Sequence, residues 1–536
     1  MPKIPNFILA LISALLLSVS WFYPFTIFIF FALVPLFIIE QNITNSLSIK
    51  RKKLAVIGYS YLVFFTWNIC VTWWIYFASF GGAALAIICN SLLMTIVFNI
   101  WRNFKERTQY SWAIWALIPI WLAFEYGHTL WDLTWTWLTL GNVFAFSHNW
   151  VQWYEFTGTS GGSLWVLIVN ILLFKIIKSN NYSLKILSKP IAIVLIPIII
   201  SIIILKTIDK SDNKLKTYKT LIIQPNIDPY NEKFYFEPDV QLKKVLTQIN
   251  SKLDSTIDYL VLPETFLTET IYEGQENNSF SINFLKDSLI KKYPNLTIIT
   301  GANTIYSFKP NEEISATAQQ FNNSVEYYDS YNTGMQINNS LDIAIYHKSK
   351  LVPGVEQMPF PALLKPLEKL AINLGGTMGS LGTQKERTVF FNKQKTVGIA
   401  PVICYESVYP DFVAEYVRNG ANLIFIMTND GWWENTPGHK QHLAYAQLRA
   451  IETRREIARC ANTGISCFIT KTGEIEQATK YWEKATITKS LIANNENTFF
   501  VKFGDLISYT SSILALLLIT IGWYFKLFLR KKEKIN

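Results

Sequence analysis

Residues 399–406 read Ile-Ala-Pro-Val-Ile-Cys-Tyr-Glu, an apolar run that ends on a thiol and a carboxylate. Two other short apolar runs end in a similar way: 258–264, Asp-Tyr-Leu-Val-Leu-Pro-Glu, ends on a carboxylate, and 345–348, Ile-Tyr-His-Lys, ends on an ammonium group. Such runs are typical of buried strands whose last side chain projects into a cleft. From residue 217 onward they alternate with amphipathic stretches, which predicts an α/β domain.

The α/β domain has room for several strands and helices in about 300 residues, enough to bury a sizeable core. The predicted strands are 219–224, 258–262, 297–301, 342–346, 397–403, 422–427 and 465–470. The predicted helices are 237–253, 281–292, 409–418 and 439–461.

The two ends of the chain are apolar, although only half of the 536 residues are hydrophobic. Fourteen of the eighteen Trp lie at or before Trp165, as is typical of membrane-interface aromatics. A bilayer core requires roughly 20 apolar residues of helix. The sequence predicts eight spans, at 6–22, 24–40, 54–76, 80–101, 110–127, 161–178, 189–206 and 507–526. We expect the first to be retained and not cleaved as a signal peptide, because a second apolar run follows it directly.

Basic residues indicate the orientation, because they stay on the cytoplasmic side during insertion. Lys and Arg cluster after the second, fourth, sixth and eighth spans, and none lies between Lys53 and Arg102 or between Arg107 and Lys175. Both termini are therefore expected to be cytoplasmic. We predict a membrane domain at 1–206 with seven transmembrane helices, an extracytoplasmic catalytic domain at 207–506, and an eighth helix with a basic cytoplasmic tail at 507–536.

Several other classes of protein fit the sequence poorly. The net charge of +10 could suggest nucleic acid, but many of the basic residues cluster between apolar runs. A transporter would need ionisable residues deep inside its spans, and only Glu125 comes near, toward a span end. The five Cys form no CxxC pair, and Cys70 and Cys89 lie inside apolar runs, where packing is the expected role.

The three polar strand ends together suggest a nucleophilic thiol. Taken singly, Cys404 could be a small buried hydrophobe, Glu264 a helix cap and Lys348 a solvated surface residue. Together, Glu264 can serve as the base that a thiol requires, and Lys348 can stabilise the thiolate and the oxyanion formed when a carbonyl is attacked.

The histidines argue against the main competitor, a Cys-His protease. The chain has five His, and His347 would point away from the site if its neighbour Lys348 points into it. His439 and His442 form a lone HxxH without a third ligand, so no metal site is predicted. The sequence also lacks phosphate-loop and dinucleotide-binding glycine patterns, and no cofactor is expected.

At these residues the chain resembles the nitrilase superfamily and, within it, the apolipoprotein N-acyltransferases. The motifs are LPET at 262–265, YHKSKLVPGVE at 346–356, ICYES at 403–407 and TNDGWW at 428–433. The resemblance covers the whole chain and implies seven spans, an outward nitrilase-like α-β-β-α sandwich and a final span. One departure is that the family commonly reads LVPFGE where residues 351–356 read Leu-Val-Pro-Gly-Val-Glu, so the Gly is displaced.

The resemblance also implies roles for individual residues. Glu264 would be the general base, Lys348 the oxyanion stabiliser and Cys404 the nucleophile, with the backbone N–H of Tyr405 as a second oxyanion donor. The other implied supporting or substrate-binding residues are Asn332, Glu356, Tyr405, Glu406 and Trp432.

The implied reaction is a two-step acyl transfer at the bacterial inner (cytoplasmic) membrane, with the catalytic domain on the periplasmic side. Cys404 would take a fatty acyl chain from a phospholipid, and the amine of diacylglyceryl-cysteine on an apolipoprotein would accept it. Partners are therefore these two substrates and the bilayer, without nucleic acid, and a monomer is expected. Two alternatives stay open: a membrane-anchored amidase with water as acceptor, and a non-catalytic lipid or lipoprotein binder.

The segment 359–382 is apolar and ends in glycines at 375, 376 and 379. It is either an arm over the site that moves to admit lipid or a helix that packs on the core, and periodicity alone does not separate the two.

Overall fold

The fold comes from a computed structural model, which describes residues 4–208, 215–233, 235–357 and 381–533. Its contacts divide the chain into two compact units. The first comprises Met1–Trp73, Ala83–Thr207 and Phe503–Asn536, and the second comprises Trp74–Gly82 and Ile208–Lys502. Trp74–Gly82, which the sequence places around the link between the third and fourth spans, is thus grouped with the second unit.

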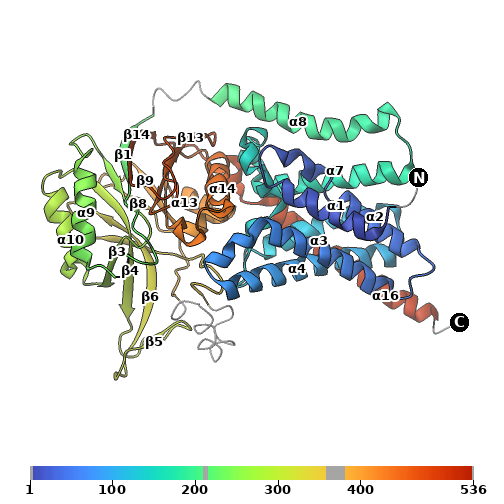
Figure 1. The fold of residues 1–536 in the computed structure, drawn as a ribbon, viewed down its shortest axis with the longest axis horizontal. Coiled ribbons are helices and arrows are strands. Elements are labelled where there is room, and N and C mark those ends of the chain that lie inside the picture. Colours follow the sequence, from blue (N-terminus) through green and yellow to red (C-terminus); the bar gives the residue numbers. More distant parts are fainter. Residues whose placement is uncertain (1–3, 209–214, 234, 358–380, 534–536) are drawn as a thin grey trace. The chain divides into compact units, whose positions relative to one another are not determined.

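The first unit is helical in its described part (Figure 1). Its α-helices are α1 (Asn6–Val19), α2 (Val34–Asn45), α3 (Lys52–Thr72), α4 (Phe80–Thr108, from Ala83 onward), α5 (Leu117–Gly127), α6 (Tyr154–Thr157), α7 (Thr159–Ser179), α8 (Leu184–Ile208) and α16 (Leu506–Glu533). Shorter 3₁₀ helices are Phe25–Phe30, Ser111–Ala116, Thr136–Leu138 and Leu140–Trp150.

Six helical segments of the described chain are long and apolar enough to cross a membrane, so the protein is a multi-pass membrane protein. They are Phe25–Asn45, Lys52–Phe77, Phe80–Thr108, Thr159–Ser179, Leu184–Ile208 and Leu506–Phe525. The other two predicted spans form shorter helices, α1 with 14 residues and α5 with 11. At 1.5 Å per residue, α1 rises only about 21 Å, less than the roughly 30 Å of a bilayer core.

The helices of the first unit bury aromatic and polar side chains against one another and expose apolar ones. Asn90 of α4 donates to Asn68 of α3 (2.8 Å), a type of contact that joins helices where water is absent. Glu125, the ionisable residue singled out from the sequence, accepts from Trp121 Nε1 (3.0 Å) and from the Leu140 N–H (2.8 Å). These contacts tie the Glu125 carboxylate to its own helix and to the chain that follows it.

The second unit contains two β-sheets. The larger has eight strands in the order β14-β1-β2-β4-β6-β5, with β3 paired to β4 and β7 paired to β6. The smaller has six, in the order β13-β12-β11-β10-β9-β8. The strands of the larger sheet are β1 (Thr217–Gln224), β2 (Tyr259–Val261), β3 (Leu267–Tyr272), β4 (Thr297–Ser307), β5 (Gln319–Gln320), β6 (Tyr327–Ile337), β7 (Ala344–His347) and β14 (Ala485–Ile492). Those of the smaller sheet are β8 (Phe390–Phe391), β9 (Gly398–Ile403), β10 (Leu423–Thr428), β11 (Ile457–Ala461), β12 (Cys467–Ile469) and β13 (Ile475–Glu476).

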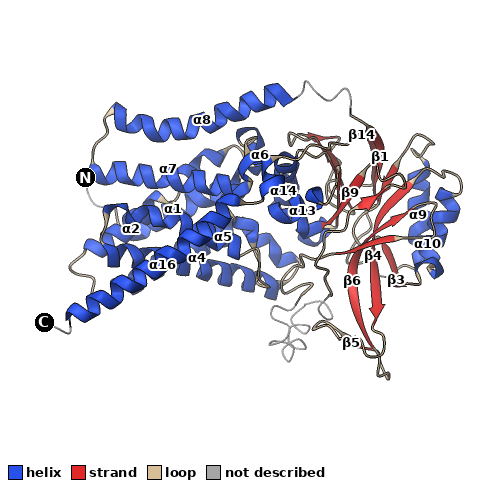
Figure 2. Ribbon diagram, turned by 180° about the vertical axis from the view of Figure 1, so that it is seen from behind, coloured by secondary structure: helices blue, strands red, loops and turns tan. Residues whose placement is uncertain are grey.

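Helices cover the outer face of each sheet, which gives the four-layer α-β-β-α sandwich that the family resemblance implied (Figure 2). Alternation along β1 shows why: Leu221 and Ile223 pack with α9 and α10, whereas Ile222 points into the core between the sheets. That core also receives Phe425 of β10. The helices of this unit are α9 (Pro238–Asn250), α10 (Phe280–Leu285), α13 (Pro410–Arg418), α14 (Pro437–Thr453) and α15 (Phe499–Phe503, as far as Lys502).

All seven predicted strands are present, but one predicted helix is wrong at its end. The helix expected over 439–461 stops at Thr453, because Arg454 adopts a left-handed conformation (φ 50°). Residues Ile457–Ala461 form β11 instead, which pairs in parallel with β10. The charged residues around this point suggested an amphipathic helix, yet Arg455 and Arg459 are both buried. Tertiary pairing therefore decided the structure here.

Candidate active site

Cys404 lies where β9 ends and the 3₁₀ helix Cys404–Val408 begins. Its backbone is left-handed (φ 47°), a conformation that residues other than Gly adopt at a cost of about 1–3 kcal/mol. The side chain is buried, with 8% of its surface exposed. A strained turn after a buried strand thus holds the thiol in one direction.

Glu264 follows β2 and lies against β4, where Gly301 leaves room for it. A Cβ at Gly301 would come within 2.4 Å of the Thr265 amide nitrogen and 2.7 Å of Glu264 Cα. No side chain fits at that distance, so the glycine allows the backbone of Glu264 to approach the sheet.

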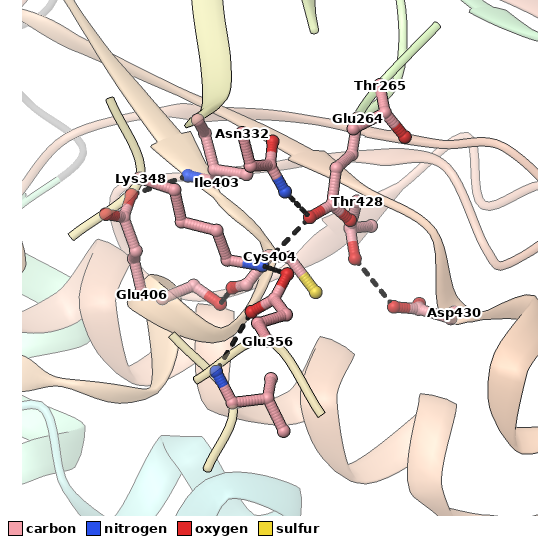
Figure 3. A network of polar contacts seen from close by, with 12 residues as sticks. Glu264, Thr265, Asn332, Lys348, Glu356, Ile403, Cys404, Glu406, Thr428 and Asp430 are labelled. Atoms are coloured by element: carbon pink, nitrogen blue, oxygen red, sulfur yellow. Dashed lines mark hydrogen bonds and ion pairs between the residues drawn. The ribbon is translucent and has the colours of Figure 1, made fainter. Parts of the chain in front are cut away.

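Lys348 follows β7 and lies between two carboxylates (Figure 3). Its Nζ donates to Glu264 Oε1 (2.9 Å) and to Glu356 Oε1 (2.7 Å). The Cys404 sulfur lies beside this cluster. The ends of three strands from two different sheets therefore bring a thiol, a carboxylate and an ammonium group together.

Asn332, which was named from the sequence, and the backbone of Val352 hold these two carboxylates in place. Asn332 of β6 donates through Nδ2 to Glu264 Oε1 (2.8 Å). The Val352 N–H donates to Glu356 Oε2 (2.9 Å) across a turn in which Gly354 has φ 77°. The displaced glycine of the 351–356 loop thus serves a left-handed position, and Glu356 still reaches Lys348.

The charges of the site outweigh the effect of burial at Glu264 and Lys348, but not at Cys404. Burial acts to raise the pKa of Glu264, but the charges of Lys348 and Lys233 outweigh it and hold that pKa below its ordinary value. Burial acts to lower the pKa of Lys348, but Glu264 and Glu356 raise it well above its ordinary value. Burial and the charge of Glu264 raise the pKa of the Cys404 thiol despite the opposing charge of Lys348. At neutral pH the site therefore holds a neutral thiol, an ionised Glu264 and a charged Lys348.

Glu406 connects the two sheets behind the thiol. It is fully buried and accepts from Tyr346 Oη (2.5 Å), the Ser349 N–H (2.7 Å) and the Ile403 N–H (2.8 Å). Because Ser349 adjoins Lys348 and Ile403 adjoins Cys404, Glu406 fixes the spacing of the ammonium group and the thiol.

Tyr405 and Trp432, also named from the sequence, each contact another aromatic ring. Tyr405 is buried, with its ring edge-on to Tyr409 (centroids 5.2 Å apart). Trp432 is partly buried and lies edge-on to Tyr230 (5.0 Å). Most of the predicted segment 359–382 lies outside the described residues. At its end, the Leu381 N–H donates to the Glu356 carbonyl (3.1 Å).

Sequence reasoning missed Lys233. Its Nζ is buried and donates to the Glu264 carbonyl (3.1 Å) and to the Thr265 hydroxyl. Burial lowers the pKa of Lys233 to about 8, partly offset by Glu264. Lys233 lies in a polar loop after β1 without a strand or motif to mark it, so no local signal could have identified it.

A second missed group lies behind Cys404. His442, which the sequence offered only as part of a lone HxxH, contacts the Cys404 carbonyl through Nε2 (3.1 Å) and Asp430 Oδ1 through Nδ1 (3.0 Å). Asp430 lies in the TNDGWW motif, but nothing in the motif indicates what Asp430 contacts. In chemical terms, the site can present a thiol to a carbonyl, take its proton and stabilise the resulting oxyanion.

Comparisons with known proteins match both units. A family model described as carbon-nitrogen hydrolase matches residues 222–494, and one described as apolipoprotein N-acyltransferase N-terminal domain matches residues 13–172. The apolipoprotein N-acyltransferase of Chlorobaculum tepidum is 28% identical over 446 residues, which is 82% of each chain. That of Geobacter metallireducens is 24% identical over 449 residues, 80% of this chain and 78% of the relative. Among solved structures, one similar chain is Saccharomyces cerevisiae Nit3, a member of branch 10 of the nitrilase superfamily. Its sequence is 16% identical, and the superposition has a TM-score of 0.37 and covers 52% of this chain and 90% of Nit3.

Proposed function

From its membership of the carbon-nitrogen hydrolase family, within which it belongs to the apolipoprotein N-acyltransferases, we propose that this chain transfers a fatty acyl chain from a membrane phospholipid to apolipoproteins. The acyl chain passes through a thioester on Cys404. The acceptor is the amino-terminal amine of diacylglyceryl-cysteine, and the product is a triacylated lipoprotein.

The observation that carries this proposal is the pair of bonds that Lys348 makes, to Glu264 at 2.9 Å and to Glu356 at 2.7 Å, beside a buried thiol. Burial and Glu264 raise the pKa of that thiol, so it is protonated at rest and requires a base during attack. Glu264, whose charge Lys348 and Lys233 maintain, is the general base. Lys348 carries a positive charge that stabilises an oxyanion, and the Tyr405 N–H is the second donor.

In the first half-reaction, the Cys404 sulfur attacks the ester carbonyl of the phospholipid while Glu264 accepts the thiol proton. The tetrahedral intermediate then expels the alcohol of the lysophospholipid, which takes the proton back from Glu264, and leaves the thioester. In the second half-reaction, the acceptor amine attacks the thioester carbonyl. Its proton moves by way of Glu264 to the departing sulfur, so an amide and the free Cys404 thiol are formed.

The supporting residues have distinct roles in this scheme. Asn332 orients the Glu264 carboxylate, Glu356 holds Lys348 from the other side, and Glu406 spaces the two strand ends. Trp432, which lies against Tyr230, binds substrate. No cofactor or metal takes part.

Anchoring by spans on both sides suits substrates that are themselves lipids, because exposing an acyl chain to water costs about 0.8 kcal/mol per CH₂. We extend the proposal to eight spans in all, with α1 and α5 completing the set. The domains are then 1–206, 207–506 and 507–536. The protein lies in the bacterial inner membrane as a monomer, with both termini cytoplasmic and residues 207–506 on the periplasmic side.

Intact-protein and peptide mass spectrometry of the purified enzyme tests the proposal. After incubation with phospholipid we expect one fatty acyl adduct on Cys404, absent in Cys404→Ser and discharged by a diacylated lipopeptide. Cys460→Ser, which changes a buried thiol on β11, is the matched control and should keep the adduct. Discharge of the adduct by water alone would indicate an amidase or hydrolase, and the lack of any adduct would indicate a binding protein; either result contradicts the proposal.

A further inference from the structure

Three charged or polar residues lie fully buried behind Cys404 and have no part in the scheme above. Asp430 Oδ2 accepts from Arg459 (2.6 Å), and Asp430 Oδ1 is 3.0 Å from His442 Nδ1. All three side chains are 0% exposed. Burying a charge is costly unless it is paired. Asp430, Arg459 and His442 pair with one another, and His442 also contacts the backbone of Cys404.

The far side of the His442 ring contacts the backbone of Cys404. His442 Nε2 is 3.1 Å from the Cys404 carbonyl oxygen and 2.9 Å from Ser407 Oγ, whose hydroxyl donates to the same carbonyl (2.7 Å). A carbonyl oxygen can only accept, so Nε2 carries the hydrogen in this contact. Asp430 and Arg459 (3.1 Å from Nδ1) hold the other side of the ring. The left-handed backbone of Cys404 therefore has two donors fixed on its carbonyl.

That carbonyl belongs to the same peptide unit as the Tyr405 N–H. A trans peptide is planar, so the direction of its C=O determines the direction of its N–H. Donors on the carbonyl also polarise the unit and make its N–H a stronger donor. Contacts made behind Cys404 thus control the amide that faces a developing oxyanion.

We propose that His442, held by Asp430 and Arg459, is a positioning residue that orients and strengthens the Tyr405 N–H as an oxyanion donor by binding the Cys404 carbonyl. Ser407 shares this role. The inference rests on the proposed function only in that Cys404 is acylated through an oxyanion, and it does not depend on a lipid substrate.

Two reactions of Cys404 separate this role from general support of the fold. Acylation by p-nitrophenyl butyrate forms a tetrahedral oxyanion, whereas alkylation by iodoacetamide displaces iodide and forms none. Both are measured on the full-length protein in detergent, by release of p-nitrophenol and by mass spectrometry of the Cys404 peptide. A residue that serves the oxyanion donor should affect acylation alone.

The variants differ in whether a donor remains on the carbonyl. His442→Leu removes it, and we expect acylation to fall about 100-fold, near the lower end of the effect of losing an oxyanion donor, with alkylation close to wild type. His442→Gln keeps an N–H near the same place, so its acylation rate should be at least about tenfold higher than that of His442→Leu. Ser407→Ala should show the same selective loss as His442→Leu, to a smaller extent.

His439 supplies the control, because it is a buried histidine one turn earlier on α14 whose ring stacks on Tyr481 (4.3 Å). His439→Gln should leave both reactions near wild type. Equal losses of acylation and alkylation in His442→Leu would show that the thiol itself is displaced and would overturn the inference, as would full acylation. Because the probe ester is not a lipid, failure of phospholipid to acylate Cys404 would count against the proposed function and leave this comparison intact.

Discussion

Gly301 lies on the strand against which the Glu264 backbone packs, and adding one methyl group there should slow the reaction at the site. In Gly301→Ala the new Cβ would lie 2.4 Å from the Thr265 nitrogen and 2.7 Å from Glu264 Cα, and both neighbours are backbone atoms that cannot rotate away. Ordinary contact begins near 3.4 Å, so the Glu264 backbone must move by about 1 Å. A displacement of that size costs on the order of 100-fold in rate, or about 2.7 kcal/mol of activation free energy.

The assay is the acylation rate of Cys404 with p-nitrophenyl butyrate, together with thermal unfolding in detergent. We expect the rate to fall about 100-fold and the free energy of unfolding to fall by about 1–3 kcal/mol from overpacking. Gly334→Ala is the matched control, because Gly334 pairs with Gly301 on the adjacent strand β6. A Cβ there would meet the end of the flexible Met427 side chain at 3.0 Å, so the rate should stay close to wild type. A wild-type rate in Gly301→Ala, or an equal loss in Gly334→Ala, would refute the reasoning.

Three other predictions concern the charges around Glu264. Lys348→Met leaves the buried Glu264 and the partly buried Glu356 without their shared cation and should destabilise the protein by about 3–5 kcal/mol at pH 7. Without Lys348, burial should raise the pKa of Glu264 in the folded variant, so the variant takes up a proton there as the pH falls and the loss should shrink at pH 5. Thermal unfolding at both pH values checks this. Lys233 has a folded-state pKa of about 8 against an ordinary 10.5, so the unfolded chain holds more protons than the folded chain between these pH values. The free energy of unfolding should therefore rise with pH in this range, by up to about 1.4 kcal/mol per pH unit relative to Lys233→Met. Stability that changes with pH equally in the two proteins would contradict this prediction. Asn332→Leu removes the 2.8 Å hydrogen bond to Glu264 Oε1, a charge-assisted bond worth about 1.5–3 kcal/mol. Acylation of Cys404 should slow by roughly 10-fold to 100-fold. An unchanged rate of alkylation by iodoacetamide would show that the thiol is intact.

The strands that end at Glu264, Lys348 and Cys404 could be predicted from the sequence, because each is a short apolar run with a polar end. Leu260 and Val261 before Glu264, and Val402 and Ile403 before Cys404, are buried on both faces of their sheets as that pattern predicts. Strand β6 was not predicted, because Tyr327–Ile337 mixes polar and aromatic residues with Gly334 and has no apolar run. Its long pairing with β4 supplies the stability that local propensity does not.

Local features of the sequence were enough to predict the membrane character of the chain and the α/β class of residues 217 onward, and to single out Glu264, Lys348 and Cys404 as candidate site residues. These follow from apolar periodicity and from polar residues at strand ends, which are local properties. Three contacts could be seen only once the chain was folded: Lys233 with the Glu264 backbone, His442 with the Cys404 carbonyl, and Gly301 with Glu264. In each contact the two residues are at least 31 positions apart in the sequence. Whether they touch depends on how the sheets and helices of the sandwich pack. A single sequence records which groups are available, whereas burial and long-range pairing decide which of them touch.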